Sequence, residues 1–574
     1  MLGKILIFIL GFCATVDCSN IVDCEDNITI EPIVDNYYRS ASKVIVKGKS
    51  VAETAWITFR ESITLSDFEI DANLLIEKRV CEEQIVGQKP NIVIIMTDDA
   101  EYSSVGFMGS EIETPNVDAW ANSDALKYKR FYNNARCAPT RASLMTGHYP
   151  HCVGLSRLPQ FPTYHPSQLG HVNSCYDMIP EYTEVEGYNN YMSGKWHLGQ
   201  NNYPPQSFEC GGGYEPQDNG FKDWFGIYEG DASYYATDSP QRWFDNAVPI
   251  APSANFYATD TIFDRAITQI GAGNEPFFSY IPLTAPHAPR DEEPGGALTQ
   301  KYIDLYTNDP DAVCIDRMEA LRDLGLLDCE VIDCDKELFS NNNLETNTTN
   351  EIYQAAVYAA KMEKVDQGFG RLIQHLKNTG QYDNTIIMFF SDNGGDLDTY
   401  SGNCAAPFKG RKFLIEEGGI LTHFAVSWPK CINEGWTDQK GWVGDILPTV
   451  MDIIDDYNPN PTIVPTQGIS LKNNWKTGLI TPREIFFKLS AFGAYIDENC
   501  KKYFKNIISG GDWVVDLNRS PCTQKITDND PNLKSELSSK FQSIYNQCNV
   551  LTPAEYDAER ACWIDPNCTT QVNQ

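Results

Sequence analysis

The 574-residue sequence has few basic side chains and little histidine. Lys and Arg number 45 against 78 Asp and Glu, which gives a net charge of -33, and there are eight histidines. Duplex-binding proteins neutralise phosphates with Lys and Arg, so this balance argues against a nucleic-acid partner. It also argues against highly sulfated polymers, unless a local basic cleft overrides the average. The charge is typical of an acidic extracellular or lysosomal protein.

Long apolar runs are also scarce. Residues 5–13 are apolar and follow Lys4, which is the pattern of a secretory signal. This run is shorter than the ~20 residues that a membrane span needs, and no other segment reaches that length. We therefore predict a signal peptide at residues 1–18, cleaved after Cys18 or alternatively after Ala14, no membrane span, and a place in the secretory pathway.

Eighteen cysteines in a secreted chain predict disulfides. Cleavage of the signal peptide would remove Cys13 and Cys18 and leave an even number of cysteines. If Cys137 is excluded, the number of cysteines left for disulfides is odd. The count therefore does not decide whether Cys137 is paired. Four N-glycosylation acceptor sequences fit the same compartment: they begin at Asn27, Asn347, Asn518 and Asn567.

Three continuous apolar runs, at 91–97, 276–285 and 384–391, have the composition of strands buried on both faces of a parallel sheet. Helical spacing follows at 114–125, 258–272 and 351–380. This alternation predicts an α/β domain at 88–460, with a polar insertion or loop at 292–350. Residues 461–574 are predicted to form a small α+β domain. Residues 19–87 are predicted to be an N-terminal extension of unknown role.

Oxygen-rich side chains stand where two predicted strands end. Asp98 and Asp99 follow the first run, and Asp392 with Asn393 follows the third. Paired aspartates are common in turns. However, ligands of α/β sheets bind beyond the carboxyl ends of the strands. Hard oxygen ligands suit Ca²⁺ or Mg²⁺ and not zinc, so the two clusters predict such a site.

Cationic groups stand in neighbouring loops. "GKWHLG" carries Lys195 and His197, "APHAP" carries His287, and "KGRK" ends in Lys412. Taken alone, each of these residues would be interpreted as an ordinary surface residue or a structural histidine. Together with a metal they are what hydrolysis of a tetrahedral anionic ester needs, because cations neutralise the oxygens and a histidine protonates the leaving group.

The segment "CAPTR" at 137–141, followed by "MTG" at 145–147, resembles the sulfatase signature C-x-P-x-R with a following T-G. Blocks such as "GKWHLG", "PLTAPHAP", "FFSDNGG" and "GRKFLIEEGG" are similar to sulfatase blocks in the family order. The resemblance covers about residues 88–455. It implies an alkaline-phosphatase-like fold: a large, mixed, mostly parallel sheet sandwiched by helices, with a smaller C-terminal α+β domain.

The resemblance also implies roles. Cys137 would be oxidised by the formylglycine-generating enzyme to Cα-formylglycine, whose hydrate is the nucleophile and a metal ligand. Asp98, Asp99, Asp392 and Asn393 would hold one Ca²⁺, with Mg²⁺ as the alternative. The remaining roles are these: Arg141 supports the hydrated aldehyde, Lys195 and Lys412 bind the sulfate oxygens, His287 protonates the leaving alcohol, and His197 takes a proton when sulfate is expelled.

Two departures from the family pattern stand out. Met145 replaces the commoner Leu, and Phe413 follows Lys412 where several relatives have a small residue, which changes the pocket shape. A block at 301–328 is similar to bacterial arylsulfatases and favours small aryl or alkyl sulfates over sulfated glycans. The alternatives are a phosphoester or phosphonate ester hydrolase, a catalytically silent anion- or carbohydrate-binding relative, and a disulfide at Cys137.

Overall fold

The structure is a computed structural model, and most of the chain from residue 89 onward is described. The described ranges are 89–199 except 164, 214–289 except 252, 274 and 275, 292–308, 317–326 except 318, 349–396, 408–456 except 430, 466–518 and 530–547. Before residue 89 only short strands are described. The predicted acceptors at Asn27, Asn347 and Asn567 lie outside the described residues, as do residues 309–316, 318 and 327–328 of the block at 301–328.

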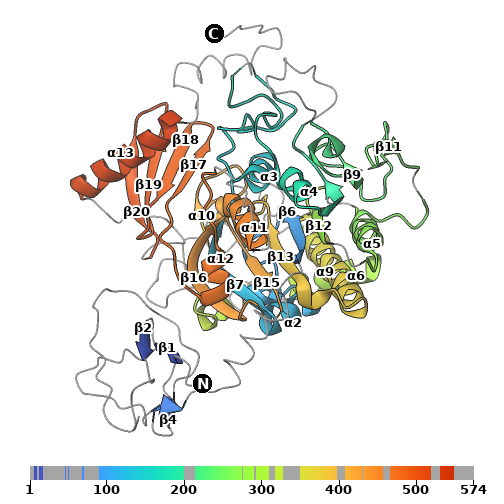
Figure 1. Cartoon of the computed structure of the whole chain (residues 1–574). Coiled ribbons are helices and arrows are strands. Elements are labelled where there is room, and N and C mark those ends of the chain that lie inside the picture. The colour runs from blue at the N-terminus through green and yellow to red at the C-terminus, as the bar shows by residue number, and fades with distance from the viewer. Residues whose placement is uncertain are drawn as a thin grey trace. The chain divides into compact units, whose positions relative to one another are not determined.

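A mixed sheet of eleven strands forms the centre of the larger unit (Figure 1). Strand β6 (Asn91–Asp98) lies between β12 (Phe277–Pro286) and β13 (Thr385–Ser391), and both pair with it in parallel. Every residue of these three strands is buried. The three apolar runs are therefore central parallel strands, as the sequence predicts.

Outside this centre the sheet is mixed. Strands β8 (Asn189–Lys195) and β9 (Asp223–Ile227) continue the parallel side beyond β12. On the other side, β15 (Phe424–Ser427) runs antiparallel to both β13 and β7 (Ala125–Tyr132). The outer strands are β10 (Phe244–Asp245), β11 (Val248–Pro249), β14 (Leu421–Thr422) and β16 (Gly435–Trp442).

The helices predicted from apolar spacing are present. They are α2 (Pro115–Ser123), α5 (Ala258–Ile270) and α9 (Thr349–Asn378). Helix α5 packs on β8, β9 and β12, and α2 packs on β7 and β15. The segment predicted as a polar insertion or loop contains a further helix, α6 (Gly296–Asn308), which packs along α9. The buried residues of α6 are Thr299 and Tyr302. Because so little of the helix is buried, its sequence is polar and does not show the apolar spacing that predicts a helix.

A four-stranded antiparallel sheet follows, built from β17 (Ile485–Leu489), β18 (Phe492–Ile496), β19 (Lys501–Asn506) and β20 (Asp512–Asp516). Helix α13 (Pro531–Gln547) covers β18 and β19, with the Phe541 ring against Phe486 and Tyr503. This sheet belongs to the same compact unit as the large sheet. The predicted α/β fold with a smaller α+β part is confirmed.

Residues 1–86 form a separate compact unit together with 477–479. Within it, β1 (Ile5–Ile9) pairs with β2 (Phe12–Val16), and β3 (Ile45–Val46) pairs with β4 (Lys49–Ser50) and β5 (Phe68–Glu69). Signal-peptide cleavage stays a prediction.

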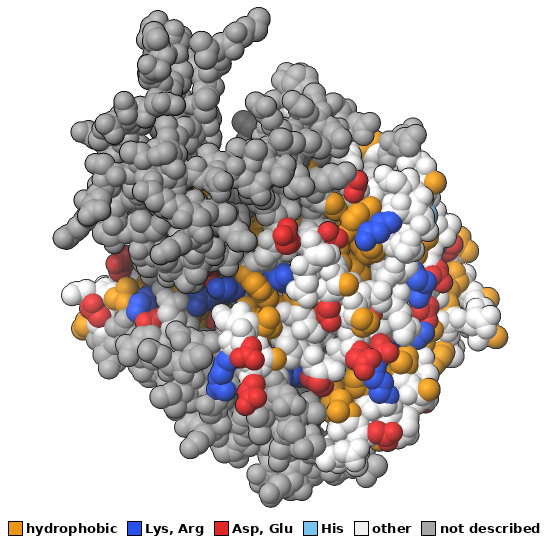
Figure 2. All heavy atoms as spheres, turned by 90° about the horizontal axis from the view of Figure 1, so that it is seen from below, with side chains coloured by type: hydrophobic (Ala, Val, Ile, Leu, Met, Phe, Trp, Pro, Cys, Tyr) orange, Lys and Arg blue, Asp and Glu red, His pale blue; other side chains and the backbone are white. Residues whose placement is uncertain are grey.

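Among the described residues, no helix has the length and apolarity that a bilayer crossing requires. On the face shown in Figure 2, the coloured acidic and basic side chains are interspersed and do not gather into one acidic field.

Candidate active site

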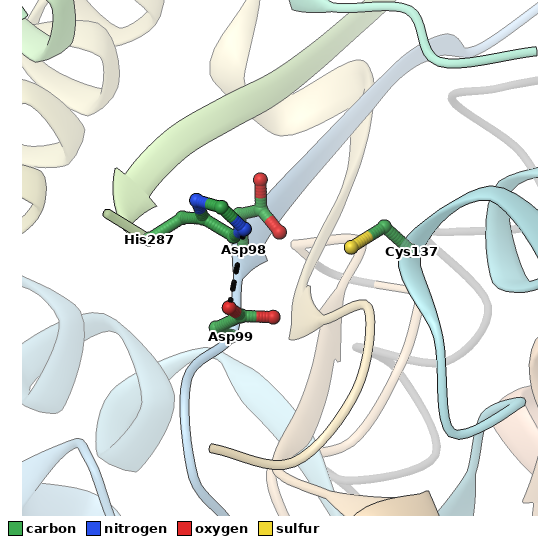
Figure 3. A group of neighbouring side chains, drawn as sticks. All are labelled: Asp98, Asp99, Cys137 and His287. Carbon is green, nitrogen blue, oxygen red and sulfur yellow. Dashed lines mark ion pairs between the residues drawn. The ribbon is translucent and has the colours of Figure 1, made fainter. Parts of the chain in front are cut away.

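The ends of four neighbouring strands form the site. Asp98 ends β6, Lys195 ends β8, His287 follows β12 and Asp392 follows β13. Because these strands are parallel neighbours, their carboxyl ends meet at one edge of the sheet. The structure brings all the predicted site residues to this edge. Cys137 faces the two aspartates from the start of a separate helix (Figure 3).

The oxygen-rich side chains form one buried cluster. Asp99, which has a left-handed backbone (φ 63°), donates its backbone N–H to Asp392 Oδ1 at 3.1 Å. Asn393 donates its amide to Asp99 Oδ1 at 2.7 Å. One ligand atom each of Asp98, Asp99, Cys137 and His287 lies within 4.8 Å of all the others. His287, predicted as an acid, thus also lies within reach of a metal.

Three cations face three carboxylates in this interior. Burial alone raises the pKa of a carboxyl group, and it holds the pKa of Asp392 at about 6, helped by the charge of Asp98. The pKa of Asp99 is lowered despite its burial, because Lys412 and His287 lie beside it. The ion pairs are Lys195 with Asp98 at 2.5 Å, Lys412 with Asp99 at 2.7 Å, and Arg141 with Asp392 at 2.8 Å.

The donor set fits a hard divalent cation. Asp98 Oδ1 and Asn393 Oδ1 are buried and accept no hydrogen bond in the described part of the chain. An unsatisfied buried oxygen is costly, and coordination to Ca²⁺ or Mg²⁺ would satisfy both. The charges of the three cations and the three carboxylates cancel. A bound divalent cation would therefore give the site a net positive charge, which attracts an anion.

Cys137 is the first residue of helix α3 (Cys137–Thr146) and has no disulfide partner. The disulfide alternative is therefore wrong for this structure. Thr140 fixes the preceding loop, since its hydroxyl accepts from the Asn134 N–H at 3.0 Å and donates to the Asn134 carbonyl at 2.7 Å. Burial, with smaller effects of Asp98 and Asp392, raises the pKa of the thiol to about 12, so it is a poor nucleophile as it stands.

Arg141 lies one turn after Cys137 on the same face of α3. Its guanidinium donates to the Lys195 carbonyl at 2.6 Å as well as to Asp392. It therefore ties three loops of the site together. Gly147 ends the helix in the left-handed region, with φ 68°, which explains the glycine of "MTG".

The two histidines are both neutral in this environment. Burial lowers the pKa of His287 to about 4, although the Asp99 charge opposes this. Burial and the neighbouring cations hold the pKa of His197 well below its usual value. Neither ring nitrogen of His197 has a hydrogen-bond partner among the described residues. Each ring could therefore take up a proton only when a nearby negative charge, such as that of a bound sulfate, stabilises the imidazolium.

Two residues of the site were missed by the sequence reasoning. The Ser391 hydroxyl accepts from the Ala100 N–H at 2.9 Å and donates to the Asn393 carbonyl at 3.0 Å, which joins the two acidic turns. A Cβ on Gly230 would lie 2.8 Å from Cε1 of His197, so this glycine makes room for the ring. Ser391 could have been named from the sequence, because it is a polar residue directly before Asp392. No local pattern marks Gly230.

Residues 90–457 match the Sulfatase family, and the chain therefore belongs to this family of sulfate ester hydrolases. The chain is 29% identical over 440 residues to an uncharacterized sulfatase of Schizosaccharomyces pombe, covering 66% of this chain and 77% of that protein. It is 25% identical over 450 residues to the arylsulfatase of Klebsiella aerogenes, covering 67% and 91%. It is 24% identical over 422 residues to human N-acetylgalactosamine-6-sulfatase, covering 70% and 68%.

The same fold occurs in solved structures. The crystal structure of Ps i-CgsB superposes with a TM-score of 0.63 at 21% identity and covers 84% of this chain and all of that one. The similar proteins carry names that refer both to aryl sulfates and to sulfated amino sugars. The predicted preference for small aryl and alkyl sulfates is not supported by these names.

Proposed function

We propose that this chain hydrolyses sulfate esters with a nucleophile made from Cys137 by oxidation to Cα-formylglycine, next to one bound Ca²⁺ or Mg²⁺. The observation that carries the proposal is the position of Cys137. An unpaired, buried cysteine opens a helix within ligand distance of Asp98 and Asp99. The family membership of residues 90–457 supports the same chemistry.

Asp98, Asp99, Asp392 and Asn393 would hold the cation, which would lower the pKa of the nucleophile and offset charge on the sulfate. The hydrated aldehyde would supply two hydroxyl groups on one carbon, one to attack sulfur and one whose deprotonation lets sulfate leave by C–O cleavage.

The other residues of the site bind the sulfate and move protons. Lys195 and Lys412 would bind the sulfate oxygens, and Arg141 would hold the residue at 137 in place. Once the negative charge of a bound sulfate ester has raised its pKa, His287 would protonate the leaving alcohol oxygen through a ring nitrogen, and His197 would take a proton at a ring nitrogen as sulfate departs. These roles rest on the common position of the side chains at one sheet edge.

Sulfated sugars are the substrates that we propose to test first, because several relatives at 24–27% identity are named N-acetylgalactosamine-6-sulfatase. We further propose that the protein works in the secretory pathway, outside the cell or in lysosomes. The apolar segment at residues 5–13 and the eighteen cysteines support this.

The decisive experiment is mass spectrometry of the peptide that contains residue 137, after expression with the formylglycine-generating enzyme. The expected mass is that of formylglycine or its hydrate, and Cys137→Ala should lower sulfate release by roughly 10⁴-fold or more with little change in melting temperature. Unmodified cysteine in an inactive wild type would point to a silent binding protein. Faster turnover of 4-nitrophenyl phosphate than of 4-nitrophenyl sulfate would point to a phosphoester hydrolase.

A further inference from the structure

Arg136 and Phe413 stand beside the site, and neither has a part in the chemistry described above. Arg136 immediately precedes Cys137, and Phe413 immediately follows Lys412. The guanidinium carbon of Arg136 lies 4.8 Å from the centroid of the Phe413 ring. The Lys412 ammonium lies 5.3 Å from the same centroid. One aromatic ring therefore joins an outer cation to a lysine of the catalytic site.

The backbone holds Phe413 in an unusual conformation. Its φ of 71° lies in the left-handed region, which a bulky residue rarely adopts. Burial does not explain the position, because 38% of Phe413 and 38% of the next residue, Leu414, remain exposed. Three backbone hydrogen bonds maintain the turn: Phe413 to Ala135 at 2.8 Å, Lys412 to Gly395 at 3.0 Å, and Leu414 to Arg411 at 2.9 Å.

Basic residues precede Phe413 in the sequence, although the protein is strongly acidic. Lys409, Arg411 and Lys412 stand within four residues of the chain, and Arg136 adds a fourth positive charge against a net charge of -33. Arg136 is partly exposed. A guanidinium stacked on an aromatic ring presents planar N–H donors, which match a carboxylate or sulfate group. Aromatic side chains beside a few fixed polar groups are typical of the residues that line ligand sites.

We propose that Arg136 and Phe413 form a subsite at the entrance of the catalytic site that binds a second anionic group of the substrate. The sugar ring would lie against Phe413 and Leu414, with its sulfate ester at Lys412 and a neighbouring carboxylate or second sulfate at Arg136. The inference rests on the proposed function and specifies its substrate class: a sulfated sugar that carries a further negative charge near the ester.

Competitive inhibition tests this subsite without requiring that the probe sugar be cleaved. The substrate is 4-nitrophenyl sulfate, and the two probes are N-acetylglucosamine 6-O-sulfate, whose 2-substituent is neutral, and glucosamine 2-N,6-O-disulfate. With the wild type we expect the disulfate to bind at least about tenfold more tightly, the effect of one charge-assisted contact. Arg136→Gln should abolish this difference, and Arg136→Lys should retain part of it.

Two further variants test whether the effect is specific to the Arg136–Phe413 pair or results from a general loss of positive charge or of folding. Phe413→Leu keeps an apolar side chain but removes the aromatic face, and it should reduce the same ratio. Arg371→Gln removes a positive charge from α9, where Arg371 pairs with Asp260 and Asp264, and it should leave the ratio unchanged. Melting temperatures of all variants are measured in parallel.

The outcomes are distinct. A wild type that hydrolyses 4-nitrophenyl sulfate but binds both sugars equally overturns the subsite and leaves the proposed function intact. A ratio that Arg136→Gln does not change also overturns it. A correctly modified wild type without activity on any sulfate ester overturns the proposed function, and the subsite with it.

Discussion

Lys502 on β19 donates hydrogen bonds to both carboxylate oxygens of Glu417, at 3.1 and 3.0 Å, and the two side chains are almost completely buried. Its ammonium also donates to the Ile415 carbonyl at 2.6 Å. The pair joins the small antiparallel sheet to helix α10 (Glu417–Ile420), which begins five residues after Lys412. The C-terminal part therefore holds the loop that supplies a lysine to the catalytic site.

Lys502→Met should lower the free energy of unfolding by about 3–5 kcal/mol, because Glu417 would keep a buried charge without its partner. The double variant Lys502→Met/Glu417→Leu should be clearly more stable than Lys502→Met alone. Chemical denaturation of the four proteins of this cycle measures the coupling. Additive losses would show that the pair does not interact energetically.

Metal binding should stabilise the protein through the crowded carboxylates of Asp98, Asp99 and Asp392. After treatment with a chelator, Ca²⁺ at about 100 times its dissociation constant should add about 2.7 kcal/mol, seen as a higher melting temperature. Asp99→Asn removes one charged ligand and should weaken the response. If the melting temperature of the wild type does not respond to Ca²⁺ or Mg²⁺, the assignment of these side chains as a metal site is wrong.

Gly230→Ala should impair catalysis by displacing His197. The new methyl group would lie 2.8 Å from Cε1 of the ring, closer than real contacts allow. A displacement of this kind should lower kcat by roughly 10- to 100-fold. Gly296→Ala is the matched control, because a Cβ at that position meets nothing within 4 Å. Equal kcat values for the two variants would show that a methyl group at position 230 does not displace His197 enough to affect catalysis.

The sequence predicts the centre of the fold well because the signal there is local. A strand buried on both faces is apolar throughout, as in residues 92–96, and the polar residues that follow it mark the sheet edge where the site forms. Pairing between distant segments has no such signal. The antiparallel β15 and the buried contact between Glu417 and Lys502, 85 residues apart, depend on tertiary packing.

The same limit applies inside the site. Asp98, Asp99, Asp392 and Asn393 follow apolar runs and could be named in advance, whereas Gly230 is defined only by the ring that it faces. Phe413 was visible as a departure from the family pattern. Its contact with Arg136 required the structure, because 277 residues separate them in the chain.

His151 should make the protein less stable in mild acid. The ring is buried, stacked on Tyr149 with centroids 5.8 Å apart and edge-on to Phe486 at 5.2 Å. Burial, with a smaller effect of Lys488, lowers the pKa of His151 to about 3. Because the unfolded chain takes up this proton near the ordinary pKa of about 6.5 and the folded protein does not, stability is complete above pH 6.5 and falls as the pH drops toward 3.

Between pH 7.5 and 5.0 this group alone should remove about 2 kcal/mol of unfolding free energy. The measurement compares wild type with His151→Phe, which keeps the aromatic packing and cannot take up a proton. The stability difference between the two proteins should shift in favour of His151→Phe by that amount as the pH falls. A difference that stays constant over this range would mean that the folded protein protonates His151 as readily as the unfolded chain does.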